Sequence, residues 1–423
     1  MSKNEHKNHN DMVVTGTSEE SLRPIPDLNI DCLEELFEWI SLADLFVIRR
    51  TCKRFKQAVD YYIKTYYPAV GKIEISDKNF AQFQRIESNC IKLIKGIRFS
   101  IKGPVIADQM EHLKECFNQV EDIRITNLKF HGDFYEDFLK FCPKLKYLSV
   151  QYCDKLKIGT GNKWLTQHYP TLQHIHFDDK IYGAEEISEL KTFFKLNPQI
   201  RTLSSTIYFL LKHTNLFCGA NIHFDYLIVS VSGYFEDEMT CVCNLLNRLH
   251  RYGFYKHVNI RGLFYSSDQE EIDLLGSVPA LEKLFMFNRE AAIPHLPDLK
   301  ELRFTLSGIP SELEAATSNL KNIERIYFEK APFDSVLLIV QHFPKVKLMK
   351  VDDIVVDGMH FKKNVIDLKA INNERRKLNG ACKMTIYVKD TIYLATKYAT
   401  TNTQLSLIAL KRSETHEWEH DYY

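Results

Sequence analysis

The sequence predicts an α/β fold: a short three-helix module at the N-terminus, followed by a curved solenoid of strand–helix repeats and an α/β C-terminal cap. Two observations predict it. Between residues 28 and 67, apolar residues recur at helical spacing. From residue 94 to residue 351, one short strand pattern recurs at steps that suit a stack of similar units.

The first predicted helix carries apolar residues at positions i, i+3, i+4 and i+7, namely Leu33, Leu36, Phe37 and Ile40. Asn29 is its expected N-cap, because its side-chain oxygen can accept a hydrogen bond from an amide of the first turn. The acidic residues that follow it suit the positive end of the helix dipole. We therefore expect a helix that begins just after Asn29.

Two more helices are expected in the same module. The second begins at Asp44 and has Leu45, Ile48, Cys52 and Phe55 on one side, and the third covers residues 58–67 before a proline. Three short helices bury little apolar surface by themselves. The module is therefore expected to need a partner or a neighbouring domain.

The stretch LNIDCLEELFEWISLADLFVIRRTCKRF, residues 28–55, resembles an F-box. The matching positions are Leu28, Asp31, Leu33, Leu36, Phe37, Ile40, Asp44, Leu45, Cys52, Lys53, Arg54 and Phe55. Asn29 replaces the usual proline and Thr51 the usual valine.

The resemblance implies binding to the Skp-family adaptor of a cullin-based ubiquitin ligase. The residues implied for adaptor binding and for the core of the module are Leu28, Leu33, Leu36, Phe37, Ile40 and Leu45. The alternative is that these apolar residues only pack a helical cap onto the repeats.

The repeats share an apolar residue followed by x-x-L-x-Φ, often after a proline. Their first apolar positions are Ile94, Val120, Leu145, Leu172, Ile200, Phe224, Tyr255, Leu281, Leu299, Ile323 and Val346. Most steps fall in the range of about 20–29 residues that is typical of leucine-rich repeats. The copy from Leu145 to Cys153 completes the L-x-x-L-x-L-x-x-C consensus. The register across residues 205–265 stays open.

Within each copy, alternating apolar residues predict a short strand with one buried face. Stacked strands would form a parallel sheet, with an outer helix such as the one expected around Phe134, Phe138 and Phe141. The other side chains of the strands face the concave surface, where exposed aromatic residues and arginine are typical of protein interfaces. The predicted substrate-binding residues are Tyr147, His174, His176, Tyr226, Phe285, Phe287, Arg303, Arg325 and Tyr327. For any single one, packing against a neighbouring strand is the alternative.

The expected domains are a disordered tail at residues 1–21, the F-box-like module at 22–68 and the repeats at 69–355. A capping segment at 356–412 and a tail at 413–423 complete the chain. The cap should contain a charged helix at 364–378 and strands at 383–388 and 405–410. A polar cap that shields the last repeat is expected of a solenoid.

Charge and composition exclude several classes of function. Lysine plus arginine and aspartate plus glutamate number 55 each, so no basic excess points to nucleic acid, despite a local basic stretch at residues 248–261. No apolar run is long enough to span a membrane, and the first twenty residues do not resemble a signal peptide. Scattered cysteines without CxxC pairs indicate free thiols in a reducing compartment, the cytosol or nucleus.

Catalytic motifs are scarce, so we expect neither an enzyme nor a cofactor. No Walker A loop, G-x-S-x-G or G-x-G-x-x-G is present. Residues 416–420, HEWEH, formally fit the zinc motif H-E-x-x-H, but no third ligand follows at the usual distance. A solvated acidic tail that docks through Trp418, or adventitious metal binding, fits better than a metallopeptidase.

Two functions remain after this. One is a substrate-recognition adaptor of an SCF-type cullin–RING ubiquitin ligase, in which the F-box binds the Skp-family adaptor and the repeats bind a target protein. The other is a leucine-rich-repeat scaffold with no link to ubiquitin. The sequence does not identify the target.

Overall fold

The computed structural model describes residues 25, 28–67, 72–76, 94–100, 104–105, 117–126, 129–130, 139–151, 163–178, 189–219, 222–231, 238–262, 269–286, 293–304, 319–356, 359–362, 365–400 and 405–416. The chain divides into two compact units, Met1–Tyr62 and Ile63–Tyr423, which we name the helical unit and the sheet unit. The helical unit contains α1 (Ile30–Phe37), α2 (Leu42–Ile48) and the first part of α3 (Lys53–Tyr66).

Helix α1 begins where the sequence predicts. The side-chain oxygen of Asn29 accepts a hydrogen bond from the Cys32 amide at 2.8 Å and caps the first turn. Helix α2 begins earlier than the predicted Asp44, because Ser41 is its N-cap. The Ser41 hydroxyl accepts from the Asp44 amide at 3.1 Å and donates to the Asp44 carboxylate at 2.7 Å.

The boundary between the second and third helices differs from the prediction. Helix α3 begins at Lys53, so Phe55 belongs to it and not to the second helix. The Thr51 hydroxyl donates to the Ile48 carbonyl at 2.7 Å at the end of α2, and the Phe55 amide donates to the Cys52 sulfur at 3.4 Å at the start of α3. Such local side-chain bonds compete with a continuous helix, which the apolar spacing alone predicted.

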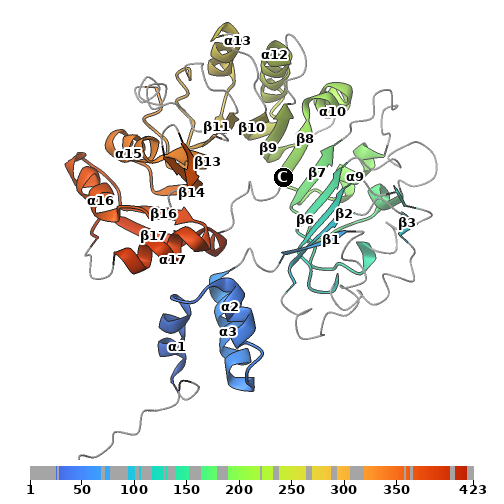
Figure 1. The fold of residues 1–423 in the computed structure, drawn as a ribbon. Coiled ribbons are helices and arrows are strands. Elements are labelled where there is room, and N and C mark those ends of the chain that lie inside the picture. Colours follow the sequence, from blue (N-terminus) through green and yellow to red (C-terminus); the bar gives the residue numbers. More distant parts are fainter. Residues whose placement is uncertain are drawn as a thin grey trace, which may run out of the picture. The chain divides into compact units, whose positions relative to one another are not determined.

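The sheet unit is built on a long parallel sheet of 14 strands (Figure 1). In spatial order they are β1 (Lys72–Ser76), β2 (Gly96–Ser100), β4 (Asp122–Thr126), β6 (Tyr147–Gln151), β7 (His174–Asp178), β8 (Thr202–Thr206), β9 (Phe224–Val231), β10 (Tyr255–Gly262), β11 (Leu281–Met286), β12 (Glu301–Phe304), β13 (Arg325–Pro332), β14 (Leu348–Val356), β16 (Met384–Val388) and β17 (Ile408–Arg412). Strand β15 (Met359–Lys362) pairs antiparallel with β14, and β3 (Pro104–Val105) pairs with β5 (Lys129–Phe130) in a second, two-stranded sheet.

Most neighbouring strands are joined through helices. These are η4 (Lys163–Thr166), α9 (Leu190–Leu196), α10 (Ile207–Lys212), α11 (Thr214–Gly219), α12 (Glu238–Arg251), α13 (Gln269–Asp273), η5 (Leu274–Ser277), α15 (Phe333–His342), α16 (Leu368–Lys377) and α17 (Asp390–Ala399), while η6 (Ser413–Thr415) follows the last strand. Figure 1 shows α10, α12, α13, α15 and α16 along one face of the sheet. We name this the helix face and the opposite one the polar face. Among the described residues, no helix is long and apolar enough to cross a lipid bilayer.

Every predicted recurrence leads into a strand, and the strands follow one another in chain order. The cap strands at 384–388 and 408–412 and the cap helix at 368–377 lie within a few residues of their predicted positions, whereas α17 was not predicted. Phe134 and Phe138 of the expected outer helix lie outside the described residues. Residues 205–265, for which the sequence left the repeat register open, contain β9 and β10. These two strands pair in parallel from Phe224 with Tyr255 to Val231 with Gly262.

The core of the sheet unit includes a continuous row of buried side chains on the helix face. In this row each parallel strand of the long sheet from β2 to β16 contributes one residue, and paired positions run through Phe99, Ile125, Val150, Phe177, Ser205, Val229, Ile260, Leu284, Leu302, Ile326, Met349 and Ile386. Burying each large apolar side chain contributes about 1.5–3 kcal/mol. Ser205 alone in this row is polar, and its hydroxyl donates to the Phe177 carbonyl at 2.9 Å.

Buried polar side chains bind the connections to the sheet. The Asn197 side chain accepts from the Tyr169 amide at 2.6 Å and donates to the carbonyls of Gln167 and Phe193 at 2.9 Å each. In the cap, Arg375 is fully buried and donates to backbone carbonyls of five residues, Val340, Phe343, Pro344, Val346 and Cys382. These bonds fix loops that have no strand partner of their own.

One contact joins the two ends of the sheet unit in sequence. Arg412 on β17 donates to the Tyr67 hydroxyl at 2.5 Å. Its guanidinium also lies 2.7 Å from the Asp390 carboxylate and 4.6 Å from the centre of the Tyr393 ring. Arg412 is almost fully buried, and the Asp390 carboxylate and the Tyr393 ring compensate its charge.

Candidate protein-interaction surfaces

Three of the residues that the F-box resemblance implies lie in the core of the helical unit. Leu33, Phe37 and Leu45 are at most 1% exposed, and the Phe37 ring packs edge-on against Tyr62 at 5.4 Å between ring centres. Leu28, Leu36 and Ile40 are half-buried. The Leu28 carbonyl accepts a bond from Arg54 at 2.5 Å, which ties the chain before α1 to α3.

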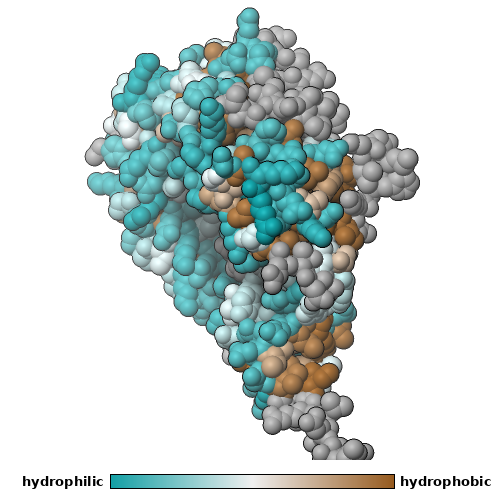
Figure 2. All heavy atoms as spheres, turned by 90° about the vertical axis from the view of Figure 1, so that its left-hand side faces the viewer, coloured by the Kyte–Doolittle hydropathy of each residue, from teal (hydrophilic) through white to brown (hydrophobic). Residues whose placement is uncertain are grey.

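A second group of apolar residues in the helical unit is exposed and was not singled out from the sequence. Its members are Ile30, Trp39, Phe46, Val47 and Tyr61, with Phe46 40% and Val47 61% exposed. Figure 2 shows hydrophobic side chains gathered on this part of the chain. The sequence does carry a sign of this exposed group. Phe46 and Val47 follow the buried Leu45 directly, so they lie off the apolar stripe of the helix, at positions where a solvated helix normally carries polar residues.

An ion pair joins two parts of the helical unit. Arg49, which is almost buried, lies with its Nε 2.5 Å from Asp60 Oδ1 and with its Nη2 3.2 Å from Oδ2. The two-pronged geometry connects the end of α2 to α3. The exposed apolar residues are thus presented on a fixed set of helices.

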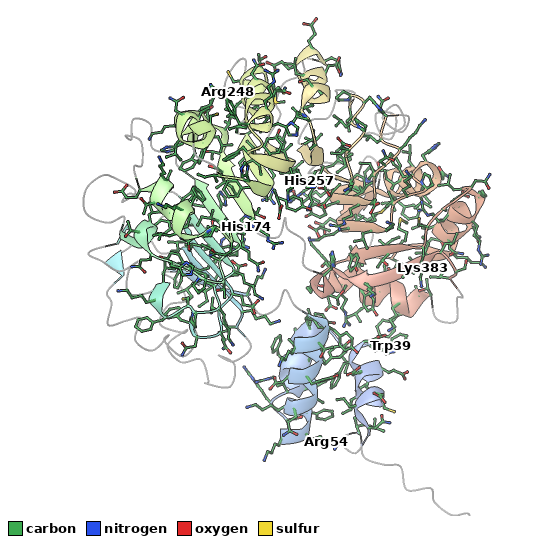
Figure 3. All side chains as sticks on the ribbon, turned by 180° about the vertical axis from the view of Figure 1, so that it is seen from behind. Trp39, Arg54, His174, Arg248, His257 and Lys383 are labelled. Carbon is green, nitrogen blue, oxygen red and sulfur yellow. The ribbon has the colours of Figure 1, made fainter. Side chains whose placement is uncertain are left out.

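The described residues predicted to bind a substrate all lie on the polar face of the sheet. In one row, Tyr147, His174 and Tyr226 occupy equivalent positions on β6, β7 and β9, with Thr202 between His174 and Tyr226. The Tyr147 and His174 rings lie 4.4 Å apart. Figure 3 shows His174 and His257 on strands of the sheet and Arg248 on a helix. Phe287 lies outside the described residues.

His176 lies two residues further along β7, on the same face as His174, and is almost fully buried. Its Nδ1 lies 3.2 Å from the Gln151 side-chain nitrogen. Burial, and then the positive charges of Arg261 and Arg124, lower the pKa of His176 to about 3. The same causes, together with His176, hold the pKa of His174 well below its usual range. Both imidazoles are therefore neutral at physiological pH, between two arginines.

A third group of predicted residues lies on β11 to β13. Phe285, Arg303 and Tyr327 are paired in sequence across these strands. The Arg303 guanidinium lies 4.4 Å from the Phe285 ring centre and 4.3 Å from that of Tyr327, a double cation–π arrangement. Arg325 lies two residues before Tyr327, is exposed, and is 3.5 Å from the carboxylate of Glu301.

A row of alternating charge follows the starts of the strands, a feature that was missed in the sequence. It includes Glu121, Lys146, Arg201, Asp225, Lys256, Glu282, Lys300, Glu324 and Lys347, each directly after the first apolar residue of its repeat. Ion pairs join Lys146 to Glu121 at 2.9 Å, Lys256 to Asp225 at 2.6 Å and Lys347 to Glu324 at 3.1 Å. The hydrogen bond from Lys256 is the main cause that lowers the pKa of Asp225.

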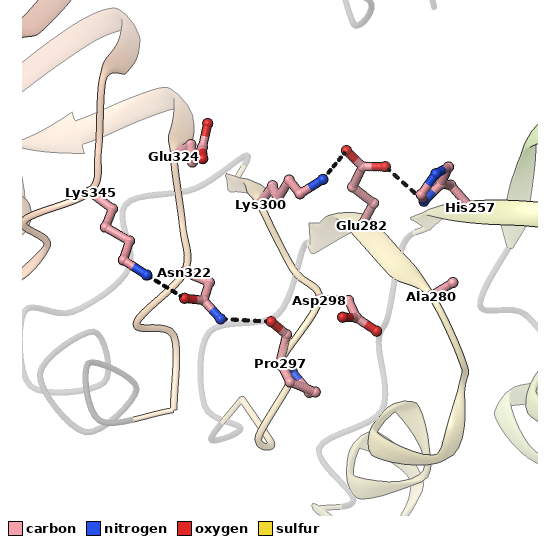
Figure 4. A pocket seen from close by; sticks show the side chains of 9 residues that line it. All are labelled: His257, Ala280, Glu282, Pro297, Asp298, Lys300, Asn322, Glu324 and Lys345. Atoms are coloured by element: carbon pink, nitrogen blue, oxygen red, sulfur yellow. Dashed lines mark hydrogen bonds and ion pairs between the residues drawn. The ribbon is translucent and has the colours of Figure 1, made fainter.

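A hollow of about 380 Å³ lies along this charge row and is lined in part by Glu282, Lys300 and Glu324 (Figure 4). Glu282 lies at its edge, 3.3 Å from His257 and 3.2 Å from Lys300. On the other side, Lys345 donates to Asn322 at 2.8 Å, and Asn322 donates to the Pro297 carbonyl at 2.8 Å. The polar groups of the hollow thus bind one another, which favours a structural role for them over a ligand site.

The other sequence features do not converge on a chemical site. Of the basic stretch, Arg248 and Arg251 lie on α12, whereas Lys256 and Arg261 lie on β10, so they do not form one track. Cys241 and Cys243 lie on α12, one exposed and one buried, and not on a strand. Within the described ranges no group of three potential metal ligands occurs. Glu417 to His420 of the H-E-x-x-H motif lie outside those ranges.

Comparison with known proteins identifies the helical module. Residues 25–65 match the family model described as the F-box domain. A comparison with curated proteins finds no match. Among solved structures, the chain is similar to one in the crystal structure of the Rad7 and Elc1 complex in yeast, with a TM-score of 0.38 and 15% sequence identity. The alignment covers 88% of this chain and 98% of that chain.

Proposed function

We propose that this chain, through its F-box domain at residues 25–65, joins a Skp-family adaptor and a cullin as the substrate-recognition subunit of an SCF-type ubiquitin ligase. The family match is the observation that carries the proposal. In it, the F-box domain binds the adaptor, and the sheet unit binds a target protein on its polar face.

The surface of the helical unit supports the first half of the proposal. Exposed Ile30, Trp39, Phe46, Val47 and Tyr61 are apolar and aromatic side chains of the kind that anchors protein interfaces. Buried Leu33, Phe37 and Leu45 act in adaptor binding by holding these helices in place. A module this small gains stability when a partner covers such a surface.

For the second half, we propose that the sheet unit is a curved leucine-rich-repeat solenoid. The regular recurrence, the parallel strands in chain order and the one-residue-per-strand rows support this interpretation. Such a solenoid offers an extended face of polar and aromatic side chains, which here includes Tyr147, His174, Tyr226, Arg303 and Tyr327.

The chain itself performs no chemistry in this proposal. It holds a target close to an enzyme bound elsewhere in the complex, which raises the effective concentration of the target. The protein acts in the cytosol or the nucleus, where thiols such as the exposed Cys32 and Cys241 stay reduced.

The experiment is co-purification with a Skp-family adaptor. A double variant, Phe46→Asp and Val47→Asp, places two charges on exposed positions and should abolish binding while the fold is kept. Leu211→Asp on α10, also at an exposed apolar position, is the matched control and should bind as the wild type does. Substituting Phe37 is less informative, because it is fully buried and its loss would unfold the module.

The outcome separates the two candidate functions. Loss of adaptor binding in the double variant alone supports the ligase subunit. A folded wild-type chain that binds no adaptor would leave a repeat scaffold without a role in ubiquitin transfer.

A further inference from the structure

Five exposed cations lie close together in the last part of the sheet unit. They are Lys345 and Lys347, which come just before or at the start of β14, Arg376 and Lys377 at the end of α16, and Lys383 just before β16. Lys383 is labelled in Figure 3 and Lys345 in Figure 4. We name these five residues the basic patch.

A buried arginine holds the segments of the basic patch together. The Nη2 atom of Arg375 donates to the carbonyls of Pro344 at 2.8 Å, Val346 at 2.9 Å and Cys382 at 3.2 Å. Each of these three residues directly precedes a lysine of the patch, and the two cations of α16 directly follow Arg375. The five cations are therefore carried on segments that one guanidinium fixes to one another.

Two cations of the basic patch have a carboxylate partner. The Lys347 ammonium lies 3.1 Å from the Glu324 carboxylate, and the Lys377 ammonium lies 2.6 Å from that of Glu374. Both lysines are more than half exposed, so these pairs are solvated and each contributes at most about 1 kcal/mol.

The other three cations have no carboxylate partner among the described residues. The Lys345 ammonium donates to the Asn322 side-chain oxygen at 2.8 Å (Figure 4), and Arg376 donates to the Ser406 hydroxyl at 3.0 Å. Both partners are neutral, and each cation keeps further donors for an anion. No ion pair joins Lys383 to a described residue.

The charge of the basic patch is more than α16 needs for its own stability. Cations in the last turn suit the negative end of the helix dipole, which accounts for Arg376 and Lys377. Lys345, Lys347 and Lys383 lie outside that helix. Beneath them, all described hydrogen bonds of Arg375 go to backbone carbonyls, so its charge is not cancelled by a carboxylate either.

The surroundings of the basic patch favour a short acidic segment over a nucleic acid. Glu324 and Glu374 border the patch, so a continuous phosphate backbone that crosses it would meet two carboxylates. The chain as a whole also has no basic excess. An acidic segment of a protein can place its carboxylates on the cations without a partner and avoid the two that border them.

We propose that the basic patch binds a short acidic segment of a partner protein, whose carboxylates pair with Lys345, Arg376 and Lys383. Exposed charge pairs of this kind contribute little affinity each, so the patch adds to a larger contact and orients the partner on the last repeats. This inference depends neither on the F-box domain nor on any adaptor.

The test uses the full-length chain and a fluorescent hexaglutamate peptide, with binding followed by anisotropy. The peptide should bind saturably at about 0.1 M salt and be released at about 1 M salt, where the screening length falls from about 10 Å to about 3 Å. A hexaglutamine peptide of the same length should show no saturable binding, because it offers no charge to the patch.

A matched pair of double variants locates the site. Lys345→Gln with Lys383→Gln removes two cations without a carboxylate partner and should weaken hexaglutamate binding about fivefold. Lys146→Gln with Lys256→Gln removes the same charge from exposed strand starts elsewhere and should change binding less than about twofold. Circular dichroism of both variants shows that the fold is kept.

Equal weakening by the two double variants would overturn the proposal, since the peptide would then sense only the total charge of the chain. A folded wild-type chain that binds hexaglutamate no better than hexaglutamine would overturn it as well. Tighter binding of a short DNA duplex, lost in the Lys345 and Lys383 variant, would assign the patch to nucleic acid instead. No adaptor is present in these titrations, so their failure leaves the proposed ligase function untouched.

Discussion

The substitution Arg375→Met in the C-terminal cap should destabilise the sheet unit by about 3 kcal/mol. Methionine keeps most of the volume of the side chain but removes all five donors. The shortest bonds lost join the guanidinium to the carbonyls of Phe343 at 2.7 Å, Pro344 at 2.8 Å and Val346 at 2.9 Å. Each hydrogen bond from a charged group contributes about 1.5–3 kcal/mol, and release of the buried charge offsets part of the loss.

Urea unfolding followed by circular dichroism measures the change, and hydrogen exchange of β16 and β17 shows whether the cap opens first. The matched control is Arg376→Met on the same helix. Arg376 is exposed and donates to the Ser406 hydroxyl at 3.0 Å, so its loss should change the free energy of unfolding by less than about 0.5 kcal/mol. If both variants are as stable as the wild type, Arg375 does not hold the cap, and the reasoning is wrong.

Three further predictions concern buried side chains. Asn197→Ala removes three hydrogen bonds to backbone groups and should lower the free energy of unfolding by about 2 kcal/mol in urea titrations; no change would contradict a structural role. Phe37→Ala should cost about 3–5 kcal/mol and unfold the F-box domain, seen as rapid hydrogen exchange in α1 to α3. His176 has a pKa of about 3 in the folded chain, so the unfolded chain binds its proton first as the pH falls. As the pH falls from 6.5 to 3, this residue should therefore lower the free energy of unfolding by about 1.4 kcal/mol per pH unit. His176→Gln should reduce that slope, and an unchanged slope in the variant would contradict the role given to His176.

The strands were predictable because alternate positions of each repeat face the core. Leu148, Ile175 and Leu203 recur at the same place in each copy and pair across neighbouring strands. A strand needs only this alternation, so the first apolar residue of each repeat located the strand that follows it. Helix ends depend on single side-chain bonds, such as that of Ser41 to Asp44, and the apolar spacing gave no sign of them.

The candidate surfaces were only partly predictable. Alternation placed Tyr147 and Tyr327 on the polar face, because a strand residue next to a core residue must face the other way. Burial on that face is decided by neighbouring strands, which periodicity does not show. Arg375 was part of a helix expected to be charged, yet it is fully buried and donates to backbone carbonyls. In the F-box domain, the helical stripe located the core and not the exposed Phe46 and Val47.

The measurement that tests the central claim most directly is size-exclusion chromatography with light scattering of the wild-type chain, a Skp-family adaptor and the N-terminal part of a cullin. We predict a complex with one copy of each protein, in which the adaptor is required for the cullin to join. A chain that is folded by circular dichroism but elutes apart from the adaptor would contradict it.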